Sequence, residues 1–265
     1  MAKKSAEEVW RHLLTEHHFL QSPLSWLPHA PRCAMCSVPF EGIGGALAHA
    51  VGYRRWNKNP TLCNQCVTHM PEGGLEVDLA IMFADVRGST SLGEQLEPRA
   101  FAEILNRFYR LAIDVLSPHR AIIDKMIGDE VMAFFVSMGT RDYRASAVAA
   151  ATELMRRFSE VLPEEETPRL GIGLNAGLAY VGKVGEGEMS DFTALGDTIN
   201  VGARLQAEAK AGEIVMSEDL YESVAAAYPD LERRVLHLRG REGPMTVRIL
   251  SAGADPVGEA IGADS

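Results

Sequence analysis

Apolar positions along the chain follow two spacings, and each spacing predicts a kind of element. Residues 98–116 carry apolar side chains three and four positions apart, which predicts an amphipathic helix facing a core. An Ala-rich stretch over 143–161 predicts a second helix. Residues 77–86 are a nearly unbroken apolar run, as in a strand that is buried on both faces. Residues 121–135 hold two apolar runs around a Gly-Asp pair, which predicts a hairpin.

The second half of the chain continues this mixture. Glycine and apolar residues interleave over 170–182, as in a strand that another backbone approaches closely. Residues 197–209 are predicted to be helical, 213–217 to form a strand, and 219–227 to form a short helix. A final hairpin is expected over 235–250. Strands and helices in this order predict an α+β fold.

The pattern also divides the chain into parts. Residues 1–22 are predicted to contain an amphipathic helix, and residues 23–72 a small module rich in proline, glycine and cysteine. Residues 73–251 would form the main domain. Residues 252–265 hold too little apolar mass to fold, so a disordered tail is expected.

The net charge of the chain excludes some classes of binding partner. The 265-residue chain has a formal net charge of −10, which argues against a general binder of nucleic acids or anionic membranes. Residues 1–70 nevertheless hold seven Lys/Arg against four acids, including the cluster Arg54, Arg55 and Lys58, which is expected to dock on the acidic remainder or on a partner. Because no apolar run approaches the roughly 20 residues that span a bilayer, and no signal peptide is evident, we expect a soluble, cytoplasmic protein.

Four cysteines form two Cys-x-x-Cys pairs, Cys33 with Cys36 and Cys63 with Cys66. Two such pairs can supply four thiolates in a tetrahedral array, so a zinc-ribbon-like module around one structural Zn²⁺ is predicted. Iron or an iron–sulfur centre remains an alternative, because thiolates also suit iron. Disulfides or free thiols are the third possibility. The glycine-rich loop between the pairs is expected to depend on the metal for its shape.

Two carboxylates stand at the ends of predicted strands. Asp85 closes the buried strand and is followed by a turn of small residues, and Asp129 sits at the tip of the predicted hairpin. A carboxylate there, next to a small-residue turn that opens a helix, could hold a metal ion and a phosphate. The alternative is that both are ordinary turn carboxylates.

Three motifs resemble those of the class III nucleotidyl cyclases. Residues 83–90 resemble the family's first metal motif, residues 125–129 its second, and residues 192–204 the segment that contacts base, ribose and phosphate. They occur in the family's order over about residues 76 to 250, so the chain is identified as a member of this family. The resemblance implies a catalytic domain with a ferredoxin-like palm and added elements.

The resemblance also implies the catalytic ions. Two Mg²⁺ (or Mn²⁺) ions would be held by the carboxylates of Asp85 and Asp129 and by the Val86 carbonyl. The backbone amides from Gly88 through Ser89 to Thr90 would face the substrate phosphates. One ion would acidify the attacking 3′ hydroxyl of the ribose and the other would neutralise the triphosphate.

Hydrogen-bond polarity favours adenine as the base. Lys125 can only donate, and adenine offers an acceptor at N1, whereas guanine offers a donor there. The Thr193 hydroxyl can accept from the exocyclic amine of adenine. Guanylyl cyclases usually place an acid at the position of Lys125, so ATP is the expected substrate and a guanylate cyclase is the alternative.

The remaining family roles fall on the second half of the chain. Asn200 would orient the ribose, and Arg204 would meet the charge that develops on the α-phosphate; their i, i+4 spacing puts them on one helix face. A cation for the terminal phosphates is expected from the final hairpin, with Arg239 as the choice and Arg241 as the fallback.

In the family, the base-selecting and metal-binding residues of one chain serve different active sites. Because this chain has both kinds, a homodimer with two equivalent sites is expected, and the four-cysteine module is expected to set the arrangement of its two catalytic domains. The expected activity is an adenylate cyclase that converts ATP to 3′,5′-cyclic AMP and pyrophosphate in intracellular signalling. A catalytically silent nucleotide-binding regulatory module is the alternative from another class.

Overall fold

The computed structural model describes residues 5–15, 22–28, 30–138, 140, 142–161, 169–187, 190–251 and 253. Its elements in chain order are α1 (Ala6–Thr15), α2 (Gly42–Ala50), β1 (Arg55–Trp56), β2 (Asn59–Cys63), α3 (Asn64–His69), β3 (Gly74–Val86), α4 (Ser89–Gln95), α5 (Pro98–Leu116), β4 (Ile122–Ile127), β5 (Glu130–Val136), α6 (Tyr143–Val161), β6 (Leu170–Val184), β7 (Asp191–Leu195), α7 (Asp197–Glu208), β8 (Glu213–Ser217), α8 (Glu218–Glu222), β9 (Glu232–Leu236) and β10 (Met245–Ser251).

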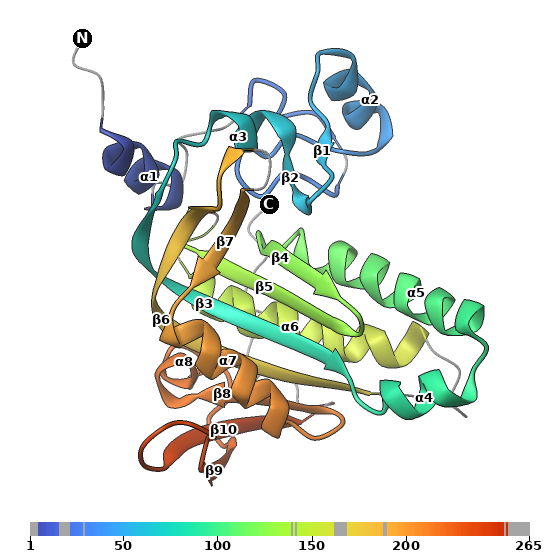
Figure 1. Ribbon diagram of the computed structural model, residues 1–265, viewed down its shortest axis with the longest axis vertical. Coiled ribbons are helices and arrows are strands. Elements are labelled where there is room, and N and C mark those ends of the chain that lie inside the picture. The colour runs from blue at the N-terminus through green and yellow to red at the C-terminus, as the bar shows by residue number, and fades with distance from the viewer. Residues whose placement is uncertain are drawn as a thin grey trace.

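One mixed sheet organises the described chain. Its strands run in the order β4-β5-β3-β6-β8-β10-β9, and β7 pairs with β6 off this path. The β6 and β8 strands are parallel, and the other neighbours are antiparallel. The short pair β1 and β2 lies apart, together with α2 and α3, above the β4 and β7 end of this sheet (Figure 1). The α+β fold predicted from the element order is therefore confirmed.

The central strand β3 is buried on both faces, as its apolar run predicts. Alternate side chains point to opposite faces of a strand. Ala80, Met82 and Ala84 pack in one cluster with α5, α6 and α8, whereas Ile81 and Phe83 pack in a second cluster with α1, α7 and the cysteines. Each cluster covers one face of β3, and Asp85 near the end of the strand is only partly buried.

Helix α7 lies directly against the sheet because β6 has a glycine at the crossing. A Cβ atom on Gly173 would lie 2.2 Å from the Gln206 nitrogen and 2.5 Å from the Gly202 oxygen, both in the α7 backbone. The close backbone approach predicted for residues 170–182 is thus present. It fixes how the helix that carries Asn200 and Arg204 sits on the sheet.

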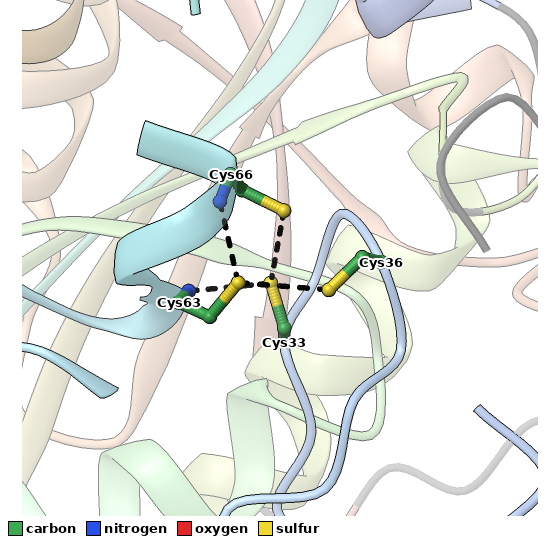
Figure 2. Close-up of side chains that lie close together, drawn as sticks. All are labelled: Cys33, Cys36, Cys63 and Cys66. Carbon is green, nitrogen blue, oxygen red and sulfur yellow. Dashed lines mark hydrogen bonds between the residues drawn. The ribbon is translucent and has the colours of Figure 1, made fainter. Parts of the chain in front are cut away.

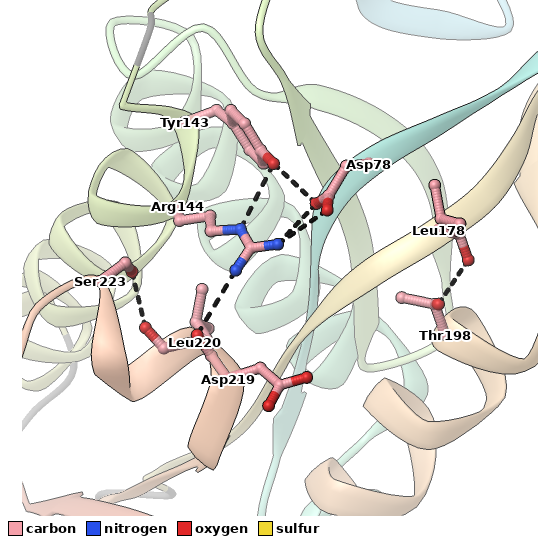
Figure 3. A network of polar contacts seen from close by, with 8 residues as sticks. All are labelled: Asp78, Tyr143, Arg144, Leu178, Thr198, Asp219, Leu220 and Ser223. Atoms are coloured by element: carbon pink, nitrogen blue, oxygen red, sulfur yellow. Dashed lines mark hydrogen bonds and ion pairs between the residues drawn. The ribbon is translucent and has the colours of Figure 1, made fainter.

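A polar network ties the other face together (Figure 3). Arg144 at the start of α6 donates to both carboxylate oxygens of Asp78 on β3, at 2.8 Å each, and the Tyr143 hydroxyl donates to the same carboxylate at 2.6 Å. Arg144 also donates to the Asp219 carbonyl in α8 at 3.4 Å. This carboxylate therefore serves the fold, joining a helix, a strand and a second helix.

The N-terminal part is more regular than its composition predicts. Residues 42–50 form α2, which corrects the expectation of a loop throughout that segment. Glycine is required inside this helix, because a Cβ on Gly44 would lie 2.3 Å from the Pro28 oxygen and one on Gly45 would lie 2.4 Å from the Phe40 carbonyl carbon. The basic cluster does reach the main domain, since Lys58 Nζ lies 3.3 Å from Asp191 Oδ1.

The two predicted end segments are only partly described. The amphipathic N-terminal helix is present as α1, whereas residues 16–21 lie outside the described part. The predicted tail also lies outside it, apart from Gly253. Within the described residues, every helix is too short or too polar to cross a bilayer.

Candidate active site and four-cysteine centre

The two predicted metal-binding carboxylates lie next to each other. Asp85 is the penultimate residue of β3, and Asp129 occupies the turn between β4 and β5, where Gly128 has a φ of +60°. The turn is tied to β3 because the Val86 amide donates to the Asp129 carbonyl at 3.2 Å. Ser89, the first residue of α4, donates its hydroxyl to the Asp129 carboxylate. The fold thus brings the residues of the first two motifs to one edge.

The electrostatics of this pair suit a cation. Burial, together with the charge of Asp129, raises the pKa of Asp85 to about 6, although Arg87 opposes the shift from 3.5 Å away. Burial and the same Asp129 charge also raise the pKa of Glu130. Negative charge is therefore concentrated at a partly buried site of oxygen ligands, which is the chemistry that Mg²⁺ and Mn²⁺ bind.

Lys125 and Thr193 also meet. The Lys125 ammonium lies 3.2 Å from the Thr193 hydroxyl oxygen, although the residues are on β4 and β7. A third residue joins them: Asp124 accepts from Lys125 at 3.1 Å and from the Thr193 hydroxyl at 2.6 Å. The predicted base contacts therefore form one cluster with a carboxylate that was not predicted.

The predicted phosphate contacts gather on α7 and the last hairpin. Asn200 and Arg204 lie one turn apart on α7. Arg204 and Arg239 line the same open cavity of about 410 Å³. The fallback residue Arg241 instead pairs with Asp197, at 3.1 Å between Nη1 and Oδ2. The contact to the terminal phosphates stays a prediction, and this geometry favours Arg239 for it.

These three groups remain separate within one chain. Among the described residues, no hydrogen bond or ion pair joins the carboxylate pair to the Lys125 cluster or to Arg204 and Arg239. The described contacts therefore join the residues within each group and do not join one group directly to another.

The four cysteines converge in the N-terminal module (Figure 2). The Sγ atoms of Cys33 and Cys66 are 3.8 Å apart, and those of Cys36 and Cys63 are 3.6 Å apart. All four sulfurs lie within 4.8 Å of one another and are buried. Zn–S bonds of about 2.3 Å place neighbouring sulfurs of a tetrahedron roughly 3.8 Å apart. The cluster therefore fits a single tetrahedral metal ion, whose identity the four sulfurs leave open.

Hydrogen bonds prepare these sulfurs to carry negative charge. Backbone amides donate to them, from Cys63 to the Cys33 sulfur at 3.3 Å and from Cys66 to the Cys63 sulfur at 3.4 Å. Burial opposes ionisation of Cys33, but hydrogen bonds from the other three thiols hold its pKa well below the usual value. Hydrogen bonding to Cys33 in turn raises the pKa of Cys36 and Cys66. A dication that binds here would release the remaining protons.

Sequence reasoning missed two residues of these sites. Asp124 directly follows the apolar pair Ile122 and Ile123 in a predicted strand, and a charged residue at such a position is a signal of a buried polar role. Arg87 lies within the first motif without a predicted role, yet it contacts Asp85 and donates to the Gln206 carbonyl in α7. It therefore links the carboxylate edge to the helix that carries Asn200 and Arg204.

The comparisons with known proteins agree with this geometry. Residues 76–251 match the family described as "Adenylate and Guanylate cyclase catalytic domain". The uncharacterized protein Rv1318c of Mycobacterium tuberculosis is 30% identical over 193 residues, covering 70% of this chain and 34% of that protein. The uncharacterized protein Mb1353c of Mycobacterium bovis is 30% identical over 183 residues, covering 67% and 34%. The chain thus spans about a third of the length of these relatives.

Solved structures of both substrate types resemble the chain. The guanylyl cyclase Cya2 superposes with a TM-score of 0.63 and 25% identity, over 68% of this chain and 95% of that one. The adenylyl cyclase CyaB from P. aeruginosa superposes with a TM-score of 0.61 and 26% identity, over 69% and 98%. The family match, the shared fold and the juxtaposed carboxylates lead to one conclusion. The chain belongs to the class III adenylyl and guanylyl cyclase family, and residues 76–251 are its catalytic domain.

Proposed function

We propose that this chain is an adenylate cyclase, which converts ATP to 3′,5′-cyclic AMP and pyrophosphate as a cytoplasmic homodimer in intracellular signalling. The observation that carries the proposal is the contact between Lys125 and Thr193. It pairs a donor-only ammonium with a hydroxyl, so the two can satisfy N1 and the exocyclic amine of adenine together. Guanine in the same position would place its N1–H donor against the Lys125 ammonium, which is also a donor, so no hydrogen bond could form there.

Asp85 and Asp129 would hold two Mg²⁺ or Mn²⁺ ions together with the Val86 carbonyl. When bound, these ions acidify the 3′ hydroxyl and neutralise the triphosphate. The Ser89 hydroxyl donates to the Asp129 carboxylate, and Arg87 forms an ion pair with Asp85. Both ligands are thereby oriented before any ion arrives. The start of α4, from Gly88 to Thr90, would lie against the phosphates.

Asn200 and Arg204 would act on the sugar and the reacting phosphate. Asn200 is exposed on α7 and free to orient the ribose, whereas Arg204 is half-buried and would balance charge that grows on the α-phosphate. Arg239 would hold the terminal phosphates from across the shared cavity. These roles require the α7 surface of one chain to face the carboxylates of another, so the proposal includes a homodimer.

The deciding experiment incubates the purified full chain with ATP or with GTP, plus Mg²⁺ or Mn²⁺, and separates the products by chromatography. We expect cyclic AMP from ATP and little cyclic GMP from GTP. Asp85→Asn keeps the side-chain shape and should abolish product, while Asp78→Asn, which changes the carboxylate in the Arg144 network, controls for general destabilisation. Preferential use of GTP would replace the proposal by a guanylate cyclase. Nucleotide binding by a folded dimer without any product would favour the silent regulatory module.

A further inference from the structure

The carboxylate of Asp124 occupies a position that the proposed catalytic roles leave unused. Its side chain is only 2% exposed, although it lies on β4 beside the more exposed Lys125. Both of its oxygens are engaged, Oδ1 with the Lys125 ammonium and Oδ2 with the Thr193 hydroxyl. A buried carboxylate with these two partners is costly to hold unless its hydrogen bonds are kept.

A β-bulge explains how the consecutive residues Asp124 and Lys125 both contact Thr193. Side chains of consecutive residues in a regular strand point to opposite faces. The β4–β5 register shifts between Ile123, which pairs with Ala133, and Lys125, which pairs with Met132, so Asp124 is the extra residue. The bulge re-aims the backbone locally. Asp124 and Lys125 can therefore both contact Thr193.

The donor and acceptor roles in this cluster are fixed by chemistry. A carboxylate only accepts and an ammonium only donates, so the Thr193 hydroxyl must give its single proton to Asp124 and accept from Lys125. One lone pair of the hydroxyl is then left for a ligand. Towards a bound base, Thr193 can act as an acceptor and cannot act as a donor.

We propose that Asp124 is a positioning residue for base selection, which commits the Thr193 proton and so makes this hydroxyl accept from the exocyclic amine of adenine and reject the carbonyl O6 of guanine. This inference rests on the proposed function, in which Lys125 meets N1 and Thr193 meets the 6-substituent. In Asp124→Asn, the new amide group can donate to Thr193. The hydroxyl proton is then free to turn to O6 of guanine.

The test measures the ratio of kcat/KM for ATP to kcat/KM for GTP in the full-length protein. This ratio does not depend on the fraction of active enzyme, so partial misfolding does not change it. We expect Asp124→Asn to lower the ratio at least about tenfold, a change on the scale of one base-reading hydrogen bond. Asp78→Asn, which alters the carboxylate in the Arg144 network, should leave the ratio unchanged.

A double-mutant cycle shows whether Asp124 acts through Thr193. Thr193→Val removes the hydroxyl, and in that background Asp124→Asn should change the ratio by less than about twofold. Additive effects, or an unchanged ratio in folded Asp124→Asn, would overturn the inference while leaving an ATP-specific wild type intact. A wild type that prefers GTP would instead overturn the proposed function.

A second variant covers the case in which Asp124→Asn does not fold. In Thr193→Asn, an intact Asp124 would accept a hydrogen bond from the NH₂ group of the new side-chain amide. The carbonyl oxygen of that amide would then remain to accept from the base. Preference for ATP should therefore persist in Thr193→Asn. A switch of this variant to GTP would contradict the role of Asp124.

Discussion

The hydroxyl of Thr61 accepts a hydrogen bond from the backbone amide of Ile123, with 3.0 Å between oxygen and nitrogen. Thr61 lies on β2, two residues before Cys63, and its carbonyl accepts from the Ala34 amide between the first two cysteines. Ile123 immediately precedes the bulge at Asp124. One buried threonine thus joins the four-cysteine centre to the strand that carries the proposed base contacts.

Replacing Thr61 by valine should weaken this connection with little change in shape. The buried Ile123 amide would lose its partner, so the free energy of unfolding should fall by about 1–3 kcal/mol. Turnover of ATP should fall as well, because the bulge behind Lys125 loses its support. Urea unfolding and steady-state assays measure the two effects.

Thr61→Ser is the matched control, because serine keeps the hydroxyl and removes only a methyl group. It should retain most of the activity. Equal activity losses in the serine and valine variants would show that packing, and not the hydrogen bond, matters at this position.

Metal content tests the four-cysteine centre. The purified full chain should contain one tightly bound ion per chain, and elemental analysis identifies it, with visible absorbance expected for iron and none for zinc. Cys36→Ser should lose the ion and lower the unfolding midpoint, since metal binding contributes directly to the stability of such a module. An unchanged metal content in Cys36→Ser would contradict the assignment.

The same variant tests what the centre does for catalysis. If the module sets the arrangement of the two catalytic domains, metal-free Cys36→Ser should lose activity while remaining a dimer by light scattering. Full activity in a folded, dimeric, metal-free chain would refute that role.

Mixing two inactive variants tests whether active sites form between chains. Asp85→Ala removes a metal ligand and Arg204→Ala removes the proposed α-phosphate contact, so each homodimer should be inactive. In a mixed dimer, one of the two shared sites would receive neither defect. Because half of randomly mixed dimers are heterodimers, about a quarter of the wild-type activity should return.

Heterodimer formation must be shown independently, by co-purification through two different affinity tags. Mixed dimers that form but stay inactive would place both residues in a site built by one chain.

Gly173 should be sensitive to the addition of a single methyl group. Gly173→Ala would push α7 off the sheet, because its Cβ would overlap the α7 backbone. The expected loss is about 1–3 kcal/mol in unfolding free energy, with reduced activity because Asn200 and Arg204 move with the helix. Thermal unfolding and ATP turnover measure both.

Gly93→Ala is the control for this prediction. Gly93 lies in α4, and the atoms nearest to a Cβ there would belong to the Phe101 ring, at ordinary contact distances from 3.7 Å. This variant should be neutral or slightly stabilising, because alanine favours helix. Similar losses in both variants would argue against a specific clash at Gly173.

Long periodic segments were predicted well from sequence because their own residues determine them. The helices over 98–116 and 143–161 and the strand over 213–217 have the predicted bounds. Helix α2 was not predicted, because glycine is a poor helix former in isolation and Gly44 and Gly45 are required only by neighbours far along the chain.

Contacts between site residues that are distant in sequence could not be predicted from local patterns, for a similar reason. The motifs indicated Lys125 and Thr193, but their contact through Asp124 depends on a bulge and on a strand 68 residues away. The choice between Arg239 and Arg241 depends on hairpin geometry: Arg239 lines a cavity with Arg204, whereas Arg241 pairs with Asp197, and the phosphate contact itself stays a prediction. Long-range geometry therefore supplied what spacing alone did not.

The second apolar cluster runs without interruption from Trp10 in α1, through the cysteines, to Ile81 on β3. Trp10 also stacks on Phe192, the neighbour of Thr193, with ring centroids 5.9 Å apart. A chimera joined near residue 72 would therefore expose apolar surface on both fragments. Any exchange of the N-terminal part of this chain with that of another cyclase must therefore also carry the apolar residues of the sheet face that it covers.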